Sequence, residues 1–516
     1  MNGAESIVKT LMTAGIDRCF ANPGTSEMHF LAALDRIGGI ECSLCLFEGV
    51  VTGAADGYAR ISGKPAVTLL HCGPGLANGL ANLHNAKRAR SPMVNIVGDH
   101  TRKHVGFNTP LTSDVVAVAT PFSDWVRKVE NPADLTTDVC DAIAAANGPV
   151  GQIATLILPA DLAWEEGTAP ASKIAPPAAA LQVPSENIKH AAAVIKRGEA
   201  VLIFATGAAL SEEGGRALGR LSSLKNVEYL APVNGAKFER GAGRVDIARI
   251  PYDANMALDR LAHFKHILLV GTDEPASFFA YPDKPGRMAP EGCAIHRFSD
   301  PDQDAVAALH ELANHLSIAE TAFHITRHDP ATRPTGALNP DSIAAAISAT
   351  LPENAIICDE GLTAGRAVMP LTANCPAHTW IQITGGAIGN GLPLAFGAAM
   401  GAPERRVVSV QADGSGLFTL QALWSQAHEQ ANVTTIILAN RGYQILKGEM
   451  TNIGVPDPGP LALDMMTLEN PAIDWIALSK GFGVPCAVAE DAETLARLLE
   501  QSYATSGPFL IEARIG

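Results

Sequence analysis

Apolar residues alternate along the chain between short continuous runs and longer stretches with a helical period. Near the start, apolar side chains at three- and four-residue spacing predict a helix over 4–14, and a short strand follows over 18–21. The remaining apolar runs predict strands at 66–71, 93–97, 153–158, 200–205, 266–271, 355–358, 406–411, 434–439 and 509–515. Because helical stretches separate these strands, the pattern indicates parallel sheets covered by helices.

Two tracts without a regular period divide this pattern into three units. Residues 165–185 are rich in Pro, Ala and Ser, and a second tract rich in helix- and strand-breaking residues spans 325–340. We therefore expect an α/β protein with three doubly wound parallel-sheet domains. Their predicted ranges are 1–165, 186–325 and 338–516.

Composition and charge exclude several classes of partner. The formal net charge of −15 and the aromatic content of 5% argue against a nucleic-acid partner. No apolar stretch approaches the roughly 18 residues of a membrane span and no secretion signal is evident, so we expect a cytoplasmic protein without a membrane partner. The 9 cysteines are scattered, which does not indicate a disulfide framework. Cys42 and Cys45 form an isolated C-x-x-C, a weak metal pattern whose alternative is that both thiols are packed in an apolar segment.

The segment 411–442 contains the clearest pattern for cation binding. One predicted strand is followed by the glycine-rich turn 413–416, and a second predicted strand leads to Asn440. Neighbouring parallel strands present their carboxyl ends at one edge of a sheet, where α/β proteins bind ligands. The carboxylate of Asp413 and an amide oxygen at that edge suit Mg²⁺, and the glycines let backbone N–H groups approach phosphate oxygens. The alternative is an ordinary Asp-Gly turn and an Asn at a strand end.

The separation of Asp413 and Asn440 resembles the metal- and diphosphate-binding motif of thiamine-diphosphate (ThDP) enzymes of the acetolactate synthase and benzoylformate decarboxylase type. Ala412 and Ala439 stand where that motif has its first glycine and its first asparagine, whereas the two predicted metal ligands are retained. The resemblance implies a Mg²⁺ ion bound by Asp413, Asn440 and the main-chain carbonyl of Gly442. It also implies diphosphate contacts from Gly414, Ser415 and Thr363.

A second segment, 47–60 (FEGVVTGAADGYAR), resembles the part of the same family that carries the activating glutamate. The resemblance implies that the Glu48 carboxyl group lies near N1′ of the aminopyrimidine and promotes formation of the ylid. The alternative for a glutamate at the start of a helix is a surface residue that complements the helix dipole.

Three further segments resemble cofactor-side elements of the family. Residues 386–393 resemble the loop that bends the cofactor, which implies that the carbonyl of Gly386 accepts from the amino group and that Ile388 lies between the rings. Asn78 follows the H-C-G-P-G segment and is a further predicted cofactor contact. Asp359 and Glu360, at the end of a predicted strand, also resemble a cofactor-side element of the family.

The substrate side is predicted from two N-terminal segments. His71 resembles the histidine of benzoylformate decarboxylase-like enzymes, which implies proton transfer or substrate orientation, although a lone histidine at a strand end is more often structural. The G-P-G at 73–75 instead resembles acetolactate synthase-like enzymes. The turn that contains Thr25 and Ser26 resembles the substrate-side loop of these decarboxylases, and either side chain is a candidate contact for the substrate carboxylate.

The C-terminal part of the chain supplies the remaining substrate-side prediction. The segment 443–455 is expected to lie over the substrate, where Ile445 and Leu446 indicate a partly apolar pocket. No histidine occurs in 275–287, where benzoylformate decarboxylase-like enzymes carry a second active-site histidine.

Taken with the residues above, the resemblance implies a ThDP- and Mg²⁺-dependent 2-oxo acid decarboxylase of the benzoylformate decarboxylase type, which forms an enamine after CO₂ loss. The alternative is an acetolactate synthase-like carboligase that joins this enamine to a second 2-oxo acid or aldehyde. A non-catalytic cofactor-binding homologue is a third interpretation, and Ala412 and Ala439 are its best support. FAD is not indicated in the middle domain. The family places the cofactor between the first domain of one subunit and the third domain of another, so we expect at least a homodimer, and a homotetramer is common.

Overall fold

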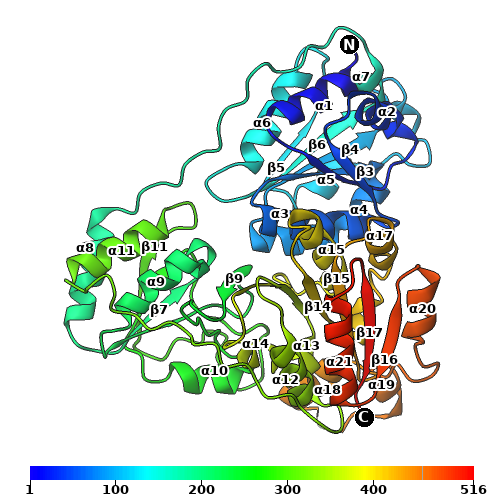
Figure 1. Ribbon diagram of the computed structural model, residues 1–516. Coiled ribbons are helices and arrows are strands. Elements are labelled where there is room, and N and C mark those ends of the chain that lie inside the picture. Colours follow the sequence, from blue (N-terminus) through cyan, green and yellow to red (C-terminus); the bar gives the residue numbers. More distant parts are fainter. Residues whose placement is uncertain (456) are drawn as a thin grey trace.

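The computed structural model describes residues 1–455 and 457–516, which form three sheets covered by helices (Figure 1). The N-terminal sheet is six-stranded and parallel, in the order β2-β1-β3-β4-β6-β5. Its strands are β1 (Arg18–Ala21), β2 (Glu41–Leu44), β3 (Ala66–His71), β4 (Met93–Asp99), β5 (Trp125–Lys128) and β6 (Ile153–Pro159). Its helices are α1 (Gly3–Thr13), α2 (Met28–Ile37), α3 (Glu48–Ser62), α4 (Cys72–Ala89), α5 (Val115–Ala119), α6 (Leu135–Ala146) and α7 (Ala160–Trp164), with 3₁₀ turns η1 (Thr25–Glu27) and η2 (Val105–Phe107).

The middle unit contains a four-stranded parallel sheet in the order β11-β10-β7-β8. Its strands are β7 (Val201–Ala205), β8 (Val227–Leu230), β10 (His266–Val270) and β11 (Ala294–Ser299). Its helices are α8 (Ser185–Lys196), α9 (Glu212–Leu221), α10 (Ala254–Leu261) and α11 (Ala305–His315), with the 3₁₀ turn η3 (Gly207–Leu210).

The C-terminal sheet has seven strands in the order β16-β17-β15-β14-β12-β13-β9. Its strands are β9 (Lys237–Arg240), β12 (Ile356–Glu360), β13 (His378–Gln382), β14 (Val407–Ala412), β15 (Val433–Ala439), β16 (Cys486–Ala489) and β17 (Phe509–Arg514). Six of them are parallel, and β9 comes from the middle segment and pairs antiparallel with β13. Its helices are α12 (Pro340–Thr350), α13 (Leu362–Gly365), α14 (Val368–Leu371), α15 (Gly391–Gly401), α16 (Asp413–Gly416), α17 (Ala422–His428), α18 (Gln444–Asn452), α19 (Pro460–Asp464), α20 (Trp475–Gly481) and α21 (Ala492–Tyr503).

The predicted α/β class with mostly parallel sheets is confirmed. Every strand predicted from an apolar run is present, with ends within two residues of the predicted ones. The predicted turn 413–416 is instead the short helix α16. Cys45 is buried as expected, but Cys42 is exposed, so the packed alternative is wrong for that thiol. None of the helices in the described part of the chain is long and apolar enough to cross a bilayer.

Helices α3 and α15 join the N-terminal and C-terminal units (Figure 1). A Cβ atom at Gly57 would lie 2.0 Å from the carbonyl oxygen of Leu394, and one at Gly397 would lie 1.8 Å from the carbonyl oxygen of Ala54. Such an approach is possible only without a side chain, which explains glycines in the middle of both helices. The contact therefore fixes the first unit tightly against the third.

Candidate active site

The predicted metal ligands lie at the ends of neighbouring strands. β14 and β15 pair in parallel, and Asp413 and Asn440 directly follow them. The Asp413 carboxylate is 3% exposed and accepts hydrogen bonds from the amides of Gly414 (2.8 Å) and Arg441 (2.6 Å). Burial raises the pKa of Asp413. A nearby cation would offset that cost, because it favours the charged carboxylate. Asn440 presents an amide oxygen, which accepts from the Gly442 amide at 3.2 Å.

A cavity of about 440 Å³ opens at this edge of the sheet and is lined by Thr363, Asn440, Arg441 and Gln444, among others. Within the described residues, the buried Thr363 hydroxyl oxygen has no hydrogen-bond partner. Buried hydroxyl groups are rarely left unpaired, so this one is free for a ligand oxygen. Asn440 lines the same cavity, and Asp413 follows the neighbouring strand, so the site fits a divalent cation and an anionic group such as a diphosphate.

The loop at 386–391 is held in place by a buried carboxylate. Glu360, at the end of β12, accepts hydrogen bonds from the amides of Gly389 (2.7 Å) and Gly391 (2.5 Å). Its side chain is fully enclosed, and burial raises the pKa of Glu360 to about 7. Gly386 has φ of 77°, a left-handed conformation that favours glycine. The loop carrying Gly386 and Ile388 is thus fixed by the strand end below it.

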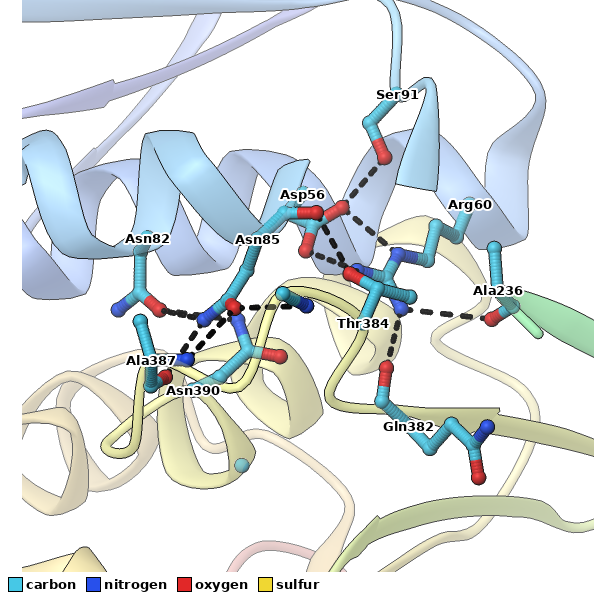
Figure 2. Close-up of polar contacts among 12 residues, drawn as sticks. Asp56, Arg60, Asn82, Asn85, Ser91, Ala236, Gln382, Thr384, Ala387 and Asn390 are labelled. Carbon is cyan, nitrogen blue, oxygen red and sulfur yellow. Dashed lines mark hydrogen bonds and ion pairs between the residues drawn. The ribbon is translucent and has the colours of Figure 1, made fainter. Parts of the chain in front are cut away.

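Two asparagines of α4 hold the same loop from the N-terminal unit (Figure 2). Asn82 donates to the carbonyls of Gly49 (2.8 Å) and Gly389 (3.2 Å), so its amide lies between the start of α3 and the loop. Asn85 donates to the carbonyl of Ala387 at 2.8 Å, and its oxygen accepts from the amides of Gly385 and Ala387. The position of the loop therefore depends on both units.

Asp56 and Arg60, which belong to the predicted activating-glutamate segment, form a buried ion pair (Figure 2). Arg60 donates from Nε to Asp56 at 2.8 Å and from Nη1 to the carbonyl of Gln382 at 2.6 Å. It also donates to the Thr384 hydroxyl at 3.2 Å, and Ser91 donates to Asp56. This pair anchors the chain just before the loop and has no free group for a ligand, so its part in the motif is structural.

Glu48 begins α3 and is 9% exposed, which contradicts the alternative of a solvated surface residue. Its Oε2 atom accepts a hydrogen bond from Asn78 at 3.0 Å, which brings together two predicted cofactor residues. A Cβ atom at Gly75 would lie 3.2 Å from Glu48 Oε1 and 3.3 Å from the Cβ atom of His71. The Glu48 carboxylate and the Cβ atom of His71 therefore both lie next to Gly75, whereas the His71 ring lies against Gly24 and Glu27.

His71 is oriented by a carboxylate that the sequence did not reveal. Its Nδ1 atom lies 2.9 Å from the Oε2 atom of Glu27, which is 3% exposed, and 3.1 Å from the Ser26 hydroxyl. Because a carboxylate accepts, the hydrogen-bond pattern assigns a proton to Nδ1, which donates it to Glu27. Nε2 is then the ring nitrogen that remains for another partner. Thr25 is exposed beside this group. The signal for Glu27 was only its place next to the predicted substrate-side loop.

Helix α18 begins shortly after Asn440, one of the predicted metal ligands, and carries the predicted pocket residues. Ile445 is half-buried and Leu446 is 45% exposed. Residues 275–287 of the middle unit reach this helix, where the Tyr281 hydroxyl donates to Glu449 at 2.8 Å. No pattern in the sequence indicated that contact.

Comparison with known proteins agrees with this geometry. The family model for the N-terminal TPP binding domain of thiamine pyrophosphate enzymes matches residues 1–118, and that for the C-terminal TPP binding domain matches residues 363–513. The chain is 45% identical to IlvX of Mycobacterium tuberculosis, provisionally described as an acetolactate synthase large subunit, over 99% of this chain and 98% of that one. It is 27% identical to benzoylformate decarboxylase of Pseudomonas aeruginosa over 96% of each chain.

Solved structures show the same fold. The ThDP-dependent 4-hydroxybenzoylformate decarboxylase of Rhodococcus jostii superposes with a TM-score of 0.87 at 22% identity, covering 100% of this chain and 99% of that one. Benzoylformate decarboxylase of Polynucleobacter necessarius gives a TM-score of 0.85 at 21% identity, with the same coverage. The two matched domains and the relative that is 45% identical over nearly the whole chain show that this protein belongs to the thiamine pyrophosphate enzyme family.

Proposed function

We propose that the chain is a ThDP- and Mg²⁺-dependent enzyme that decarboxylates 2-oxo acids, acting in the cytoplasm as a homodimer or homotetramer. The observation that carries this proposal is the presence, in one unit, of the buried Glu48 carboxyl group bonded by Asn78 and of a histidine, His71, oriented by the Glu27 carboxylate. The Glu48 carboxyl group suits activation of the cofactor, and the His71 imidazole suits proton transfer to a product carbon. Decarboxylation requires both, because the carbon that loses CO₂ must receive a proton.

The cofactor would be held between the N-terminal unit of one subunit and the C-terminal unit of another. Asp413, Asn440 and the Gly442 carbonyl would bind Mg²⁺, and Thr363, Gly414 and Ser415 would contact the diphosphate. When bound, ThDP supplies the carbon nucleophile that adds to the ketone and the electron sink that accepts the pair released with CO₂. These assignments are supported by the unpaired Thr363 hydroxyl and by the oxygen-rich ligand set at the strand ends.

Several side chains would orient the ring end of the cofactor. Gly386 would accept through its carbonyl, Ile388 would support the bent conformation, and Asn78 would hold the Glu48 carboxyl group. In its protonated form, Glu48 would donate a hydrogen bond to N1′ of the aminopyrimidine. Its burial keeps water away from that bond, which strengthens the interaction.

The proton to the product would come from His71. Glu27 accepts from Nδ1 and thereby fixes the ring, so that Nε2 can donate or accept a proton on the other side. Ser26, and the exposed Thr25 beside it, would bind the substrate carboxylate. Ile445 and Leu446 would contact its side chain.

A second candidate is carboligation, in which the same activated fragment joins a second carbonyl compound. It is favoured by the 45% identity to a protein described as an acetolactate synthase large subunit. The two reactions share every step up to CO₂ loss and differ only in what captures the carbon.

Product analysis with ThDP and Mg²⁺ tests the proposal. Incubation with pyruvate and, separately, with benzoylformate should release CO₂ and the free aldehyde. Acetolactate as the main product from pyruvate would establish the carboligase instead. Absence of CO₂ from both acids and from a wider panel of 2-oxo acids would refute both reactions.

A further inference from the structure

Four aromatic side chains of the middle unit gather against the C-terminal unit. This aromatic cluster consists of Tyr252, Phe278, Phe279 and Tyr281. The ring centroids of Tyr252 and Phe278 are 5.8 Å apart, and those of Phe278 and Phe279 are 4.9 Å apart. Phe278 and Phe279 are 42% and 58% exposed, an unusual exposure for adjacent phenylalanines. The cluster is therefore a formed surface with apolar groups available to a ligand.

The aromatic cluster lies directly over the loop that is proposed to hold the cofactor. A Cβ atom at Gly386 would be 2.6 Å from the Phe278 ring. The ring thus packs on the one residue whose carbonyl is expected to meet the cofactor's amino group. A substrate bound beside that group would extend its side chain toward the aromatic cluster.

A carboxylate is placed at the same surface. Glu449 accepts from the Tyr281 hydroxyl at 2.8 Å and from the Asn452 amide at 3.4 Å, and both donors are uncharged. Among the described residues, no Lys or Arg forms an ion pair with it. Glu449 stands one helical turn after Ile445 on α18, so the two side chains share a face. The carboxylate is therefore placed on the face predicted to contact the substrate.

The surroundings favour positive charge. Burial and the Glu449 carboxylate raise the pKa of both Tyr252 and Tyr281. The Arg366 guanidinium already lies over the Tyr252 ring at 5.3 Å, and the Lys284 ammonium over the Tyr281 ring at 5.2 Å. These two rings therefore already bind cations of the protein itself, and the exposed rings of Phe278 and Phe279 are the faces left for an organic cation in the same cluster as Glu449.

We propose that Glu449 and the aromatic cluster select a 2-oxo acid whose side chain ends in a cation, such as a guanidinium group. This inference rests on the proposed function, because it assumes that the substrate's ketone lies beside the cofactor loop. Glu449 is then a specificity-determining residue. Tyr281 positions it without contacting the charge itself.

The test compares two nearly isosteric substrates, 5-guanidino-2-oxopentanoate and the uncharged 5-ureido-2-oxopentanoate. We expect kcat/KM for CO₂ release to favour the guanidino acid by at least about tenfold, as a charge-assisted hydrogen bond allows. Glu449→Gln should bring the ratio close to one. Tyr281→Phe is the matched control: it removes the hydrogen bond between Tyr281 and Glu449 but keeps the carboxylate, whereas Glu449→Gln keeps an acceptor for Tyr281 and removes the charge, so the ratio should persist in Tyr281→Phe. Equal loss in both variants, or a ratio unaffected by Glu449→Gln, would overturn the proposal in favour of a purely structural contact.

A binding measurement separates this inference from the proposed reaction. Calorimetric titration of the same two acids is carried out with Mg²⁺ and a ThDP analogue that lacks the reactive carbon acid. Selective binding of the guanidino acid without CO₂ release from any 2-oxo acid would refute decarboxylation and support the cation site. CO₂ release and binding that do not distinguish the two acids would refute the cation site and leave decarboxylation standing. Thermal unfolding of both variants shows whether each is folded.

Discussion

The buried ion pair of Asp56 and Arg60 is a sensitive point of the contact between the N-terminal and C-terminal units. The two side chains are 0% and 3% exposed, and Arg60 also donates to the carbonyl of Gln382 and the hydroxyl of Thr384. Arg60→Met keeps a long, unbranched side chain but removes every one of these donors. The Asp56 carboxylate then remains buried, with Ser91 as a polar neighbour.

Loss of one partner of a buried pair costs about 3–5 kcal/mol, because the remaining charge is uncompensated. Each kcal/mol lowers the thermal midpoint by about 2–4 °C in a domain of 150–250 residues, so we expect a decrease of roughly 6–20 °C. Asp56→Leu combined with Arg60→Met should recover part of that loss, since no buried charge is then left. ThDP should also be retained less well by Arg60→Met, because Gln382 and Thr384 lead directly into the loop that carries Gly386.

The assay is thermal unfolding with and without ThDP and Mg²⁺. The matched control is Arg216→Met, which breaks a helical pair with Glu212 in which both side chains are 45% exposed. Such exposed pairs contribute about 0.3–0.5 kcal/mol, so its midpoint should hardly change. Equal midpoints for the two Arg→Met variants would refute the reasoning that the buried pair anchors the interface.

Three further predictions follow from the site and the core. Asp413→Asn removes the anionic metal ligand and should weaken Mn²⁺ binding, measured by electron paramagnetic resonance, at least about tenfold, since even outer partners of metal ligands contribute that much; unchanged affinity would exclude Asp413, and with it the paired site at Asn440. Glu27→Gln should lower kcat by about tenfold or more with little change in KM, because His71 loses the carboxylate that orients it; an effect confined to KM would point to substrate binding instead. Burial lowers the pKa of His378 to about 4, below its ordinary value of 6.5. The stability it contributes is therefore complete above pH 6.5 and is lost as the pH falls toward 4, by about 3 kcal/mol in total. The acid limb of the unfolding midpoint against pH should be flatter in His378→Asn, and an unchanged limb would contradict this.

How far the fold could be predicted depended on where each strand lies in its sheet. The predicted strands are internal ones, which are buried on both faces and read as continuous apolar runs. Six strands that no apolar run predicted are the two edges of each sheet: β2, β5, β8, β9, β11 and β16. β9 reads KFER and β5 reads WVRK, since an edge strand can carry charge on its solvated side. The seventh, β13, reads HTWIQ, and its polar residues are buried by contacts between distant segments.

The residues of the candidate site also fall into those that the sequence predicted and those that it did not. Glu48, Asp413 and Asn440 could be named from the sequence because the segments around them resemble motifs of a known family in residue type and spacing. Glu27 and Glu449 could not, because the hydrogen-bond partner of each is far away in the chain, His71 at 44 residues and Tyr281 at 168 residues. No local pattern encodes such a contact, which forms only when distant segments of the chain pack together. The role of Glu360 was predicted only as cofactor-side, whereas its two hydrogen bonds to the loop show how it holds that element.

The most direct measurement of the central claim, that Glu48 activates bound ThDP, is hydrogen–deuterium exchange at the thiazolium C2 atom. Exchange is followed by rapid quench and proton magnetic resonance, in the protein with Glu48 and in Glu48→Gln, at saturating ThDP and Mg²⁺. We expect fast exchange in the first and a decrease of about 10²–10⁴-fold in the second, the contribution typical of a positioned acid or base. Equal exchange rates in the two proteins, with ThDP bound in both, would contradict the claim and favour a cofactor-binding homologue without catalysis.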